Sequence, residues 1–123
     1  MSKVNSISAV ALIMASLSGN AAFAHPELQS AEPAAGSAAM IAPKQIRITF
    51  NEAVIPQFSG VELKGQTGKL IATGKAAVDP ANKNVLVVPI AEELPPGTYK
   101  VEWHAVSEDT HREKGAYSFS VGR

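Results

Sequence analysis

The sequence contains no cysteine among its 123 residues. Disulfide bonds, thiolate metal sites, zinc fingers and iron–sulfur clusters are therefore excluded. Acidic and basic residues are balanced at 11 each, so no excess of positive charge favours a nucleic acid partner. Aromatic residues make up only 6%, and no long apolar run follows residue 24. We expect residues 25–123 neither to bind nucleic acid nor to insert into a membrane.

The one long apolar run lies near the N-terminus and has the features of a secretory signal. Lys3 precedes an apolar stretch over residues 4–17, and Ala22-Phe23-Ala24 follows it. This order of charged, apolar and small-x-small segments predicts cleavage after Ala24. The stretch has about 14 residues, fewer than the roughly 20 that a membrane-spanning helix needs. We predict that residues 1–24 are a cleaved signal peptide and residues 25–123 a single domain; an uncleaved anchor and an earlier cut are the alternatives.

The remaining sequence has the pattern of short β-strands between turns. Gln45, Arg47 and Thr49 alternate with apolar residues in one such strand, which is the period of a half-buried strand. The predicted strands are 28–30, 44–50, 59–63, 69–73, 84–88, 97–106 and 115–121. Residues 31–43 are rich in Ala and Pro and are interpreted as a loop or crossover. The pattern predicts an all-β, seven-stranded Greek-key β-sandwich or barrel of the immunoglobulin-like type.

Two aromatic residues in the longest predicted strand support this architecture. Tyr99 begins the strand after a Pro-Pro-Gly turn, which resembles the tyrosine corner of immunoglobulin-like sandwiches. An ordinary Pro-Gly turn before a strand is the alternative. Trp103 shares its face of the strand with apolar residues, so we predict that it lies in the core rather than forming an exposed binding platform.

Cleavage after Ala24 would make His25 the first residue of the mature protein. A terminal histidine offers a metal ion two nitrogens, its α-amine and its ring Nδ1, and no internal histidine can do so. Pro26 has no amide hydrogen, so a metal ion at this terminus is limited to that two-nitrogen chelate. His25 is therefore the first candidate metal ligand.

Asp109 and His111 form the second candidate pair. They are two residues apart between the last two predicted strands, so in an extended segment their side chains would point the same way. A solvated turn is the alternative for such a pair. Three nitrogens and one carboxylate oxygen from His25, His111 and Asp109 would suit Cu(II). His104 lies on the polar face of its strand and is interpreted as a surface residue.

Several motifs together resemble the CopC family of periplasmic copper-resistance proteins, including its YobA-like members. They lie along the whole of residues 25–123: His25-Pro26, Phe50-Asn51-Glu52, Phe58-Ser59-Gly60, Pro96-Gly97-Thr98-Tyr99 continuing to Val101 and Trp103, Val106-Ser107-Glu108-Asp109-Thr110-His111, then Gly115, Tyr117 and Phe119. Separately most of these motifs are ordinary, but the combination is specific.

The resemblance implies a periplasmic protein that binds one Cu(II) per chain through His25, Asp109 and His111. It also implies Glu52 as a fourth or outer ligand, and an inner-membrane CopD-like protein as partner. Some members bind Cu(I) through a mid-chain loop rich in methionine. Residues 63–75 contain neither methionine nor histidine, and only Met40 remains after residue 24, so the resemblance here is to members with a Cu(II) site alone.

Two other function classes remain as alternatives. A copper site built on a terminal histidine also occurs in polysaccharide monooxygenases, so a histidine-brace oxidase is the enzymatic alternative. A structural or adhesive sandwich that binds no metal is the other. The short chain and the few aromatic residues favour a copper-binding protein that is not an enzyme.

Overall fold

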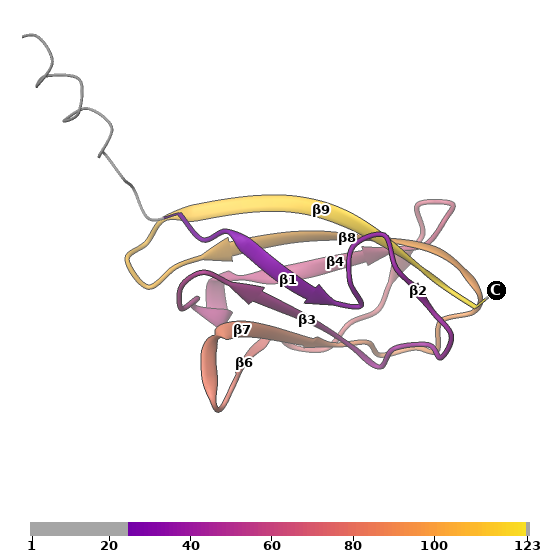
Figure 1. Cartoon of the computed structure of the whole chain (residues 1–123), viewed down its shortest axis with the longest axis horizontal. Helices are drawn as coiled ribbons and strands as arrows, with labels where there is room; N and C mark the ends of the chain where they lie inside the picture. Colours follow the sequence, from indigo (N-terminus) through magenta and orange to yellow (C-terminus); the bar gives the residue numbers. More distant parts are fainter. Residues whose placement is uncertain (1–24, 123) are drawn as a thin grey trace, which may run out of the picture.

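The computed structural model describes residues 25–122, which form two β-sheets packed face to face (Figure 1). The predicted signal peptide, residues 1–24, lies outside the described residues, as does Arg123. Within the described part, no helix is both long enough and apolar enough to cross a membrane.

Nine strands and one short 3-10 helix make up the domain. They are β1 (Leu28–Glu32), β2 (Ala38–Ala39), β3 (Gln45–Phe50), η2 (Pro56–Phe58), β4 (Gly60–Lys64), β5 (Leu70–Ile71), β6 (Ala77–Asp79), β7 (Asn82–Pro89), β8 (Gly97–Val106) and β9 (Arg112–Val121). One sheet has the order β1-β3-β7-β6 and the other β2-β9-β8-β4-β5. Neighbouring strands are antiparallel, except that β2 pairs with β9 in parallel.

The predicted all-β sandwich is confirmed, with two more strands than expected. β2 and β6 have two and three residues, too few to show an alternating pattern in the sequence. β2 lies in the Ala- and Pro-rich segment that was interpreted as a crossover, and it does carry the chain from one sheet to the other before β3 returns. β9 also begins at Arg112, three residues earlier than predicted.

The alternating residues of the long strands fill the core as predicted. Tyr99, Val101, Trp103 and Ala105 of β8 are all buried, and Trp103 meets the ring of Phe50 edge-on at 5.3 Å between centroids. The exposed-platform alternative for Trp103 is therefore wrong. Burial of each large apolar side chain contributes about 1.5–3 kcal/mol to the free energy of folding.

The predicted tyrosine corner is also present. The Tyr99 hydroxyl donates a hydrogen bond to the carbonyl oxygen of Pro95, four residues upstream, at 2.5 Å. The Tyr99 ring stacks on Phe119 of β9 with 5.7 Å between centroids. These contacts fix the turn that leads into β8.

Candidate metal centre

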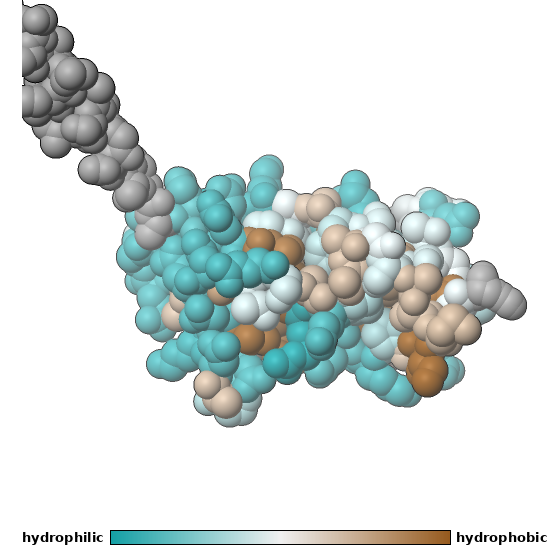
Figure 2. All heavy atoms as spheres, in the orientation of Figure 1, coloured by the Kyte–Doolittle hydropathy of each residue, from teal (hydrophilic) through white to brown (hydrophobic). Residues whose placement is uncertain are grey.

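Three segments distant in the sequence meet at one end of the sandwich. They are the chain entering β1, the corner after β3, and the turn between β8 and β9 (Figure 1). Backbone hydrogen bonds join the corner to the turn: Ile55 N–H donates to Val106 O at 2.8 Å, and Glu108 N–H donates to Ala53 O at 3.1 Å. Hydrophilic residues gather over this end of the molecule (Figure 2). The chain entering β1 reaches the same end, where the ring of His25 lies 5.6 Å from the ring of His111 between centroids.

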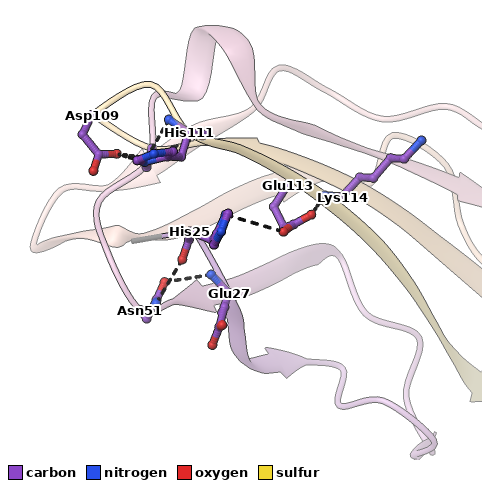
Figure 3. A network of polar contacts seen from close by, with 8 residues as sticks. His25, Glu27, Asn51, Asp109, His111, Glu113 and Lys114 are labelled. Atoms are coloured by element: carbon purple, nitrogen blue, oxygen red, sulfur yellow. Dashed lines mark hydrogen bonds and ion pairs between the residues drawn. The ribbon is translucent and has the colours of Figure 1, made fainter. Parts of the chain in front are cut away.

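His25 is held by its backbone and leaves its ring at the surface. The Asn51 side chain donates to His25 O at 3.1 Å and accepts from Glu27 N–H at 2.8 Å, while Asn51 N–H donates to Glu27 O at 3.0 Å (Figure 3). Pro26, which lies between His25 and Glu27 in the sequence, is fully buried. The side chain of His25 remains 48% exposed, so its ring is free to turn toward a ligand.

The β8–β9 turn is organised by one buried serine. Ser107 is fully buried, and its hydroxyl donates to Asp109 Oδ1 and accepts from His111 N–H at 3.3 Å. Its backbone N–H donates to His111 O at 2.9 Å. Thr110 has a positive φ of 72°, so the segment is a tight turn and not the extended chain that we expected.

The turn nevertheless brings Asp109 and His111 together. His111 Nδ1 lies 3.2 Å from Asp109 Oδ1. The hydrogen bond from Ser107 lowers the pKa of Asp109, and the hydrogen bond with His111 lowers it further, against the opposing effect of burial. A carboxylate that stays ionised beside an imidazole is a ready pair of metal ligands.

The ring of His25 lies close to this pair, but the three side chains do not point to a common centre. The rings of His25 and His111 are 5.6 Å apart between centroids and inclined by 54°. No group of three or more His, Asp or Glu side chains within residues 25–122 is arranged to hold a metal ion. Figure 3 shows two separate pairs instead: Nδ1 of His111 faces Asp109, and Nδ1 of His25 faces Glu113 at 3.9 Å. In the chain of 123 residues, the nitrogen of His25 is also part of the peptide bond to Ala24.

Comparison with known proteins decides the family. A family model described as the CopC domain matches residues 28–122. The chain belongs to the CopC family. Protein YobA of Escherichia coli strain K12 is 40% identical over 113 residues, which cover 92% of this chain and 91% of YobA.

Two further CopC-family relatives agree in sequence and structure. Copper resistance protein C of Escherichia coli is 41% identical over 107 residues, covering 81% of this chain and 83% of the relative. The crystal structure of PcoC, a methionine-rich copper resistance protein from Escherichia coli, matches with a TM-score of 0.70 and 42% identity. That match covers 80% of this chain and 99% of PcoC.

The carboxylate expected from the CopC resemblance, Glu52, directly follows Asn51, which holds His25. Its side chain is half-buried, and its Oε2 is buried with no hydrogen-bond partner within the described residues. A buried carboxylate oxygen without a partner is costly, and a bound cation would satisfy it. Within residues 25–122, no hydrogen bond or ion pair joins Glu52 to His25, Asp109 or His111, so its role as a ligand stays a prediction.

His104 takes no part in this constellation. It is exposed on the outer face of β8, where its ring lies over Gly60 of β4. A Cβ atom at Gly60 would be 3.1 Å from Cε1 of His104. The interpretation of His104 as a surface residue is confirmed.

Three residues near the site were missed by sequence reasoning. Asn51 acts through hydrogen bonds to the backbone of His25 and Glu27, and Ser107 through hydrogen bonds to the Asp109 carboxylate and the His111 backbone. Such hydrogen bonds leave no pattern in the sequence. Glu113 did leave a signal, because Asp109, His111 and Glu113 alternate in the run Asp-Thr-His-Arg-Glu. That spacing places three residues of metal-ligand type at every second position.

Proposed function

We propose that the mature protein, starting at His25, is a periplasmic protein that binds one Cu(II) ion and sequesters or delivers it. The observation that carries the proposal is the approach of the His25 and His111 rings to 5.6 Å at one end of the sandwich. Asp109 lies beside His111, and Glu52 has a buried oxygen that lacks a partner in the described residues. Membership of the CopC family supports copper as the ion, because relatives of this chain are named copper resistance proteins.

The proposed ligands are the α-amine and Nδ1 of His25, the His111 ring and the Asp109 carboxylate. Removal of residues 1–24 would convert the amide nitrogen of His25 into an amine and so complete the chelate. Two ligand atoms that each lie about 2.0–2.2 Å from one ion are roughly 3–4 Å apart. The 3.2 Å between His111 Nδ1 and Asp109 Oδ1 fits that range, so this pair needs little rearrangement.

The donor atoms favour Cu(II) over Cu(I). Imidazole and amine nitrogens with a carboxylate suit the divalent ion, whereas Cu(I) prefers sulfur ligands. PcoC is a methionine-rich protein, but this chain has three methionines in total, and Met40 is the single one beyond residue 24. Met40 lies just after β2, so it is separated in the chain from each ligand segment.

We further propose that the protein acts by binding and not by catalysis. Asp109 and Glu52 supply anionic oxygens that would occupy positions an oxygen-activating enzyme keeps open. An inner-membrane CopD-like protein is the proposed partner for copper exchange. Ascorbate-driven peroxide production by the copper-loaded protein would instead favour the histidine-brace oxidase.

The test is a Cu(II) competition titration on two purified forms of the protein. One form begins at His25, and the other carries a single additional residue before it. We expect one-to-one binding by the first form and an affinity at least about 100-fold weaker in the second, because the amine ligand is lost.

His111→Ala and His104→Ala, both made in the form that begins at His25, provide the matched pair of controls. His111→Ala should weaken binding in the same way, whereas His104→Ala should not, because His104 lies on the outer face of β8. Equal, weak binding by the two forms would overturn the proposal and leave the metal-free sandwich as the better description.

A further inference from the structure

Glu113 of β9 reaches the nitrogen of His25 that the chelate requires. Its Oε2 lies 3.9 Å from His25 Nδ1, and its Oε1 accepts a hydrogen bond from Lys114 N–H at 3.3 Å (Figure 3). The bond to Lys114 orients the carboxylate so that the second oxygen faces His25. The Glu113 side chain is 45% exposed, so it can adjust its position without disturbing the core.

The strand itself places Glu113 on the inner face of its sheet. Glu113 lies opposite Ala105 of β8, which is buried, so both residues point to that face. Arg112 and Lys114 alternate with Glu113 and point to the opposite face. Glu113 therefore lies on the face of β9 that His25 covers, whereas Arg112 and Lys114 point to the other face.

The distance suits two atoms that meet one ion. Ligand atoms of a single metal ion are roughly 3–4 Å apart, and 3.9 Å lies within that range. A carboxylate at this position would add a negative charge and a hard oxygen to a set with two imidazoles and one amine. The attraction of a negative charge is proportional to the charge of the ion, so it acts twice as strongly on Cu(II) as on Cu(I).

We propose that Glu113 is a further member of the copper site, a carboxylate beside the chelating nitrogen of His25 that selects for the divalent ion. The proposal rests on the proposed Cu(II)-binding function and adds a group that favours the divalent ion at that site. Glu113 reaches the ion from β9, on the side of His25 that Asp109 does not reach. The site then takes ligands from the N-terminal segment, the β8–β9 turn and β9.

The test uses Glu113→Gln in the form that begins at His25, which keeps the side-chain size and removes the charge. Affinities for Cu(II) and Cu(I) are measured by competition titration, and the reduction potential of the bound copper is measured directly. We expect Cu(II) affinity to fall about 10- to 100-fold. Cu(I) affinity should fall by a smaller factor, so the reduction potential should rise.

Glu108→Gln is the matched control. Glu108 is an exposed carboxylate on the same turn, and its side chain makes no hydrogen bond or ion pair within residues 25–122. If Glu113→Gln gives the same affinities and potential as Glu108→Gln while His111→Ala still weakens binding, Glu113 is not part of the site and the proposed function stands. If His111→Ala also leaves binding unchanged, the proposed function itself fails.

Discussion

At the scale of single residues, Ser107 links the two candidate ligands of the β8–β9 turn. Its hydroxyl donates to the Asp109 carboxylate and accepts from the backbone of His111, so one buried group orients both side chains. Residues that orient metal ligands commonly change metal affinity about 10- to 100-fold when they are removed. We therefore expect Ser107 to affect metal binding at the candidate site although it offers no ligand itself.

Ser107→Ala is expected to weaken Cu(II) binding by about tenfold in the form that begins at His25. The variant loses the hydrogen bond that does most to lower the pKa of Asp109, so that pKa should rise toward its ordinary value. It also leaves the His111 N–H without the serine oxygen. Competition titration at neutral pH measures the affinity.

Ser59→Ala is the control for the general cost of losing a buried serine. The Ser59 hydroxyl is also buried, donates to Ile55 O at 2.7 Å and accepts from Val106 N–H at 3.0 Å, but it touches neither ligand. Both variants should lower the free energy of unfolding, and Ser107→Ala alone should lower copper affinity. Equal copper affinities for the two variants would show that Ser107 has only a structural role.

At the scale of elements, the β8–β9 pair is the support on which the site is built. Its strands pair from Gly97 opposite Val121 to Val106 opposite Arg112, and the turn beyond them carries Asp109 and His111. Near that end, Trp103 lies opposite Gly115, and its ring folds over the glycine. A Cβ atom at Gly115 would come within 2.6 Å of Trp103 Cζ2, so this position has no room for a side chain.

Gly115→Ala is expected to reduce the free energy of unfolding by about 1–3 kcal/mol, because the buried Trp103 ring must shift within a packed core. Urea denaturation followed by tryptophan fluorescence measures it. Gly60→Ala is the matched control, since its Cβ would meet the exposed ring of His104 at 3.1 Å, and that ring can move. If Gly115→Ala proves as stable as Gly60→Ala, the Trp103–Gly115 contact does not constrain the hairpin.

Predictability from the sequence also differs among the elements. The two-residue period of β3, β8 and β9 identifies their buried faces, because each strand is long and one side of it is core. β2 has only alanines, and its pairing with β9 depends on the sandwich that brings the two strands together. Arg112 to Lys114 were left out of the last strand because three charged residues lack the alternation, yet backbone pairing with β8 extends the strand through them.

At the scale of the whole molecule, the approach of His25 to His111 follows from topology. Sequence spacing indicates that Asp109 and His111 are neighbours, and the predicted cleavage after Ala24 adds His25. The distance between His25 and the turn depends on the buried Pro26 and on the hydrogen bonds of Asn51, which no local pattern reveals. The candidate ligands could therefore be named from the sequence, but their relative positions required the fold.

At alkaline pH, the stability of the whole molecule should depend in part on Tyr117. Burial raises the pKa of Tyr117 to about 12, and its hydroxyl is buried with no hydrogen-bond partner within the described residues. In the unfolded chain a tyrosine ionises near pH 10. The free energy of unfolding that depends on protonated Tyr117 is therefore fully present below about pH 10. It is lost as the pH rises toward 12, because Tyr117 releases its proton at lower pH in the unfolded state than in the folded state.

Tyr117→Phe should reduce this alkaline dependence and leave the protein at least as stable as the wild type at pH 8, because an unpartnered buried hydroxyl is a cost. Tyr99→Phe is the contrasting variant: it loses the hydrogen bond to Pro95 O and should cost about 1 kcal/mol at pH 8. Urea denaturation of the three proteins at pH 8 and pH 11 compares them. If the wild type and Tyr117→Phe lose the same free energy of unfolding between these pH values, the Tyr117 hydroxyl reaches water in the folded state.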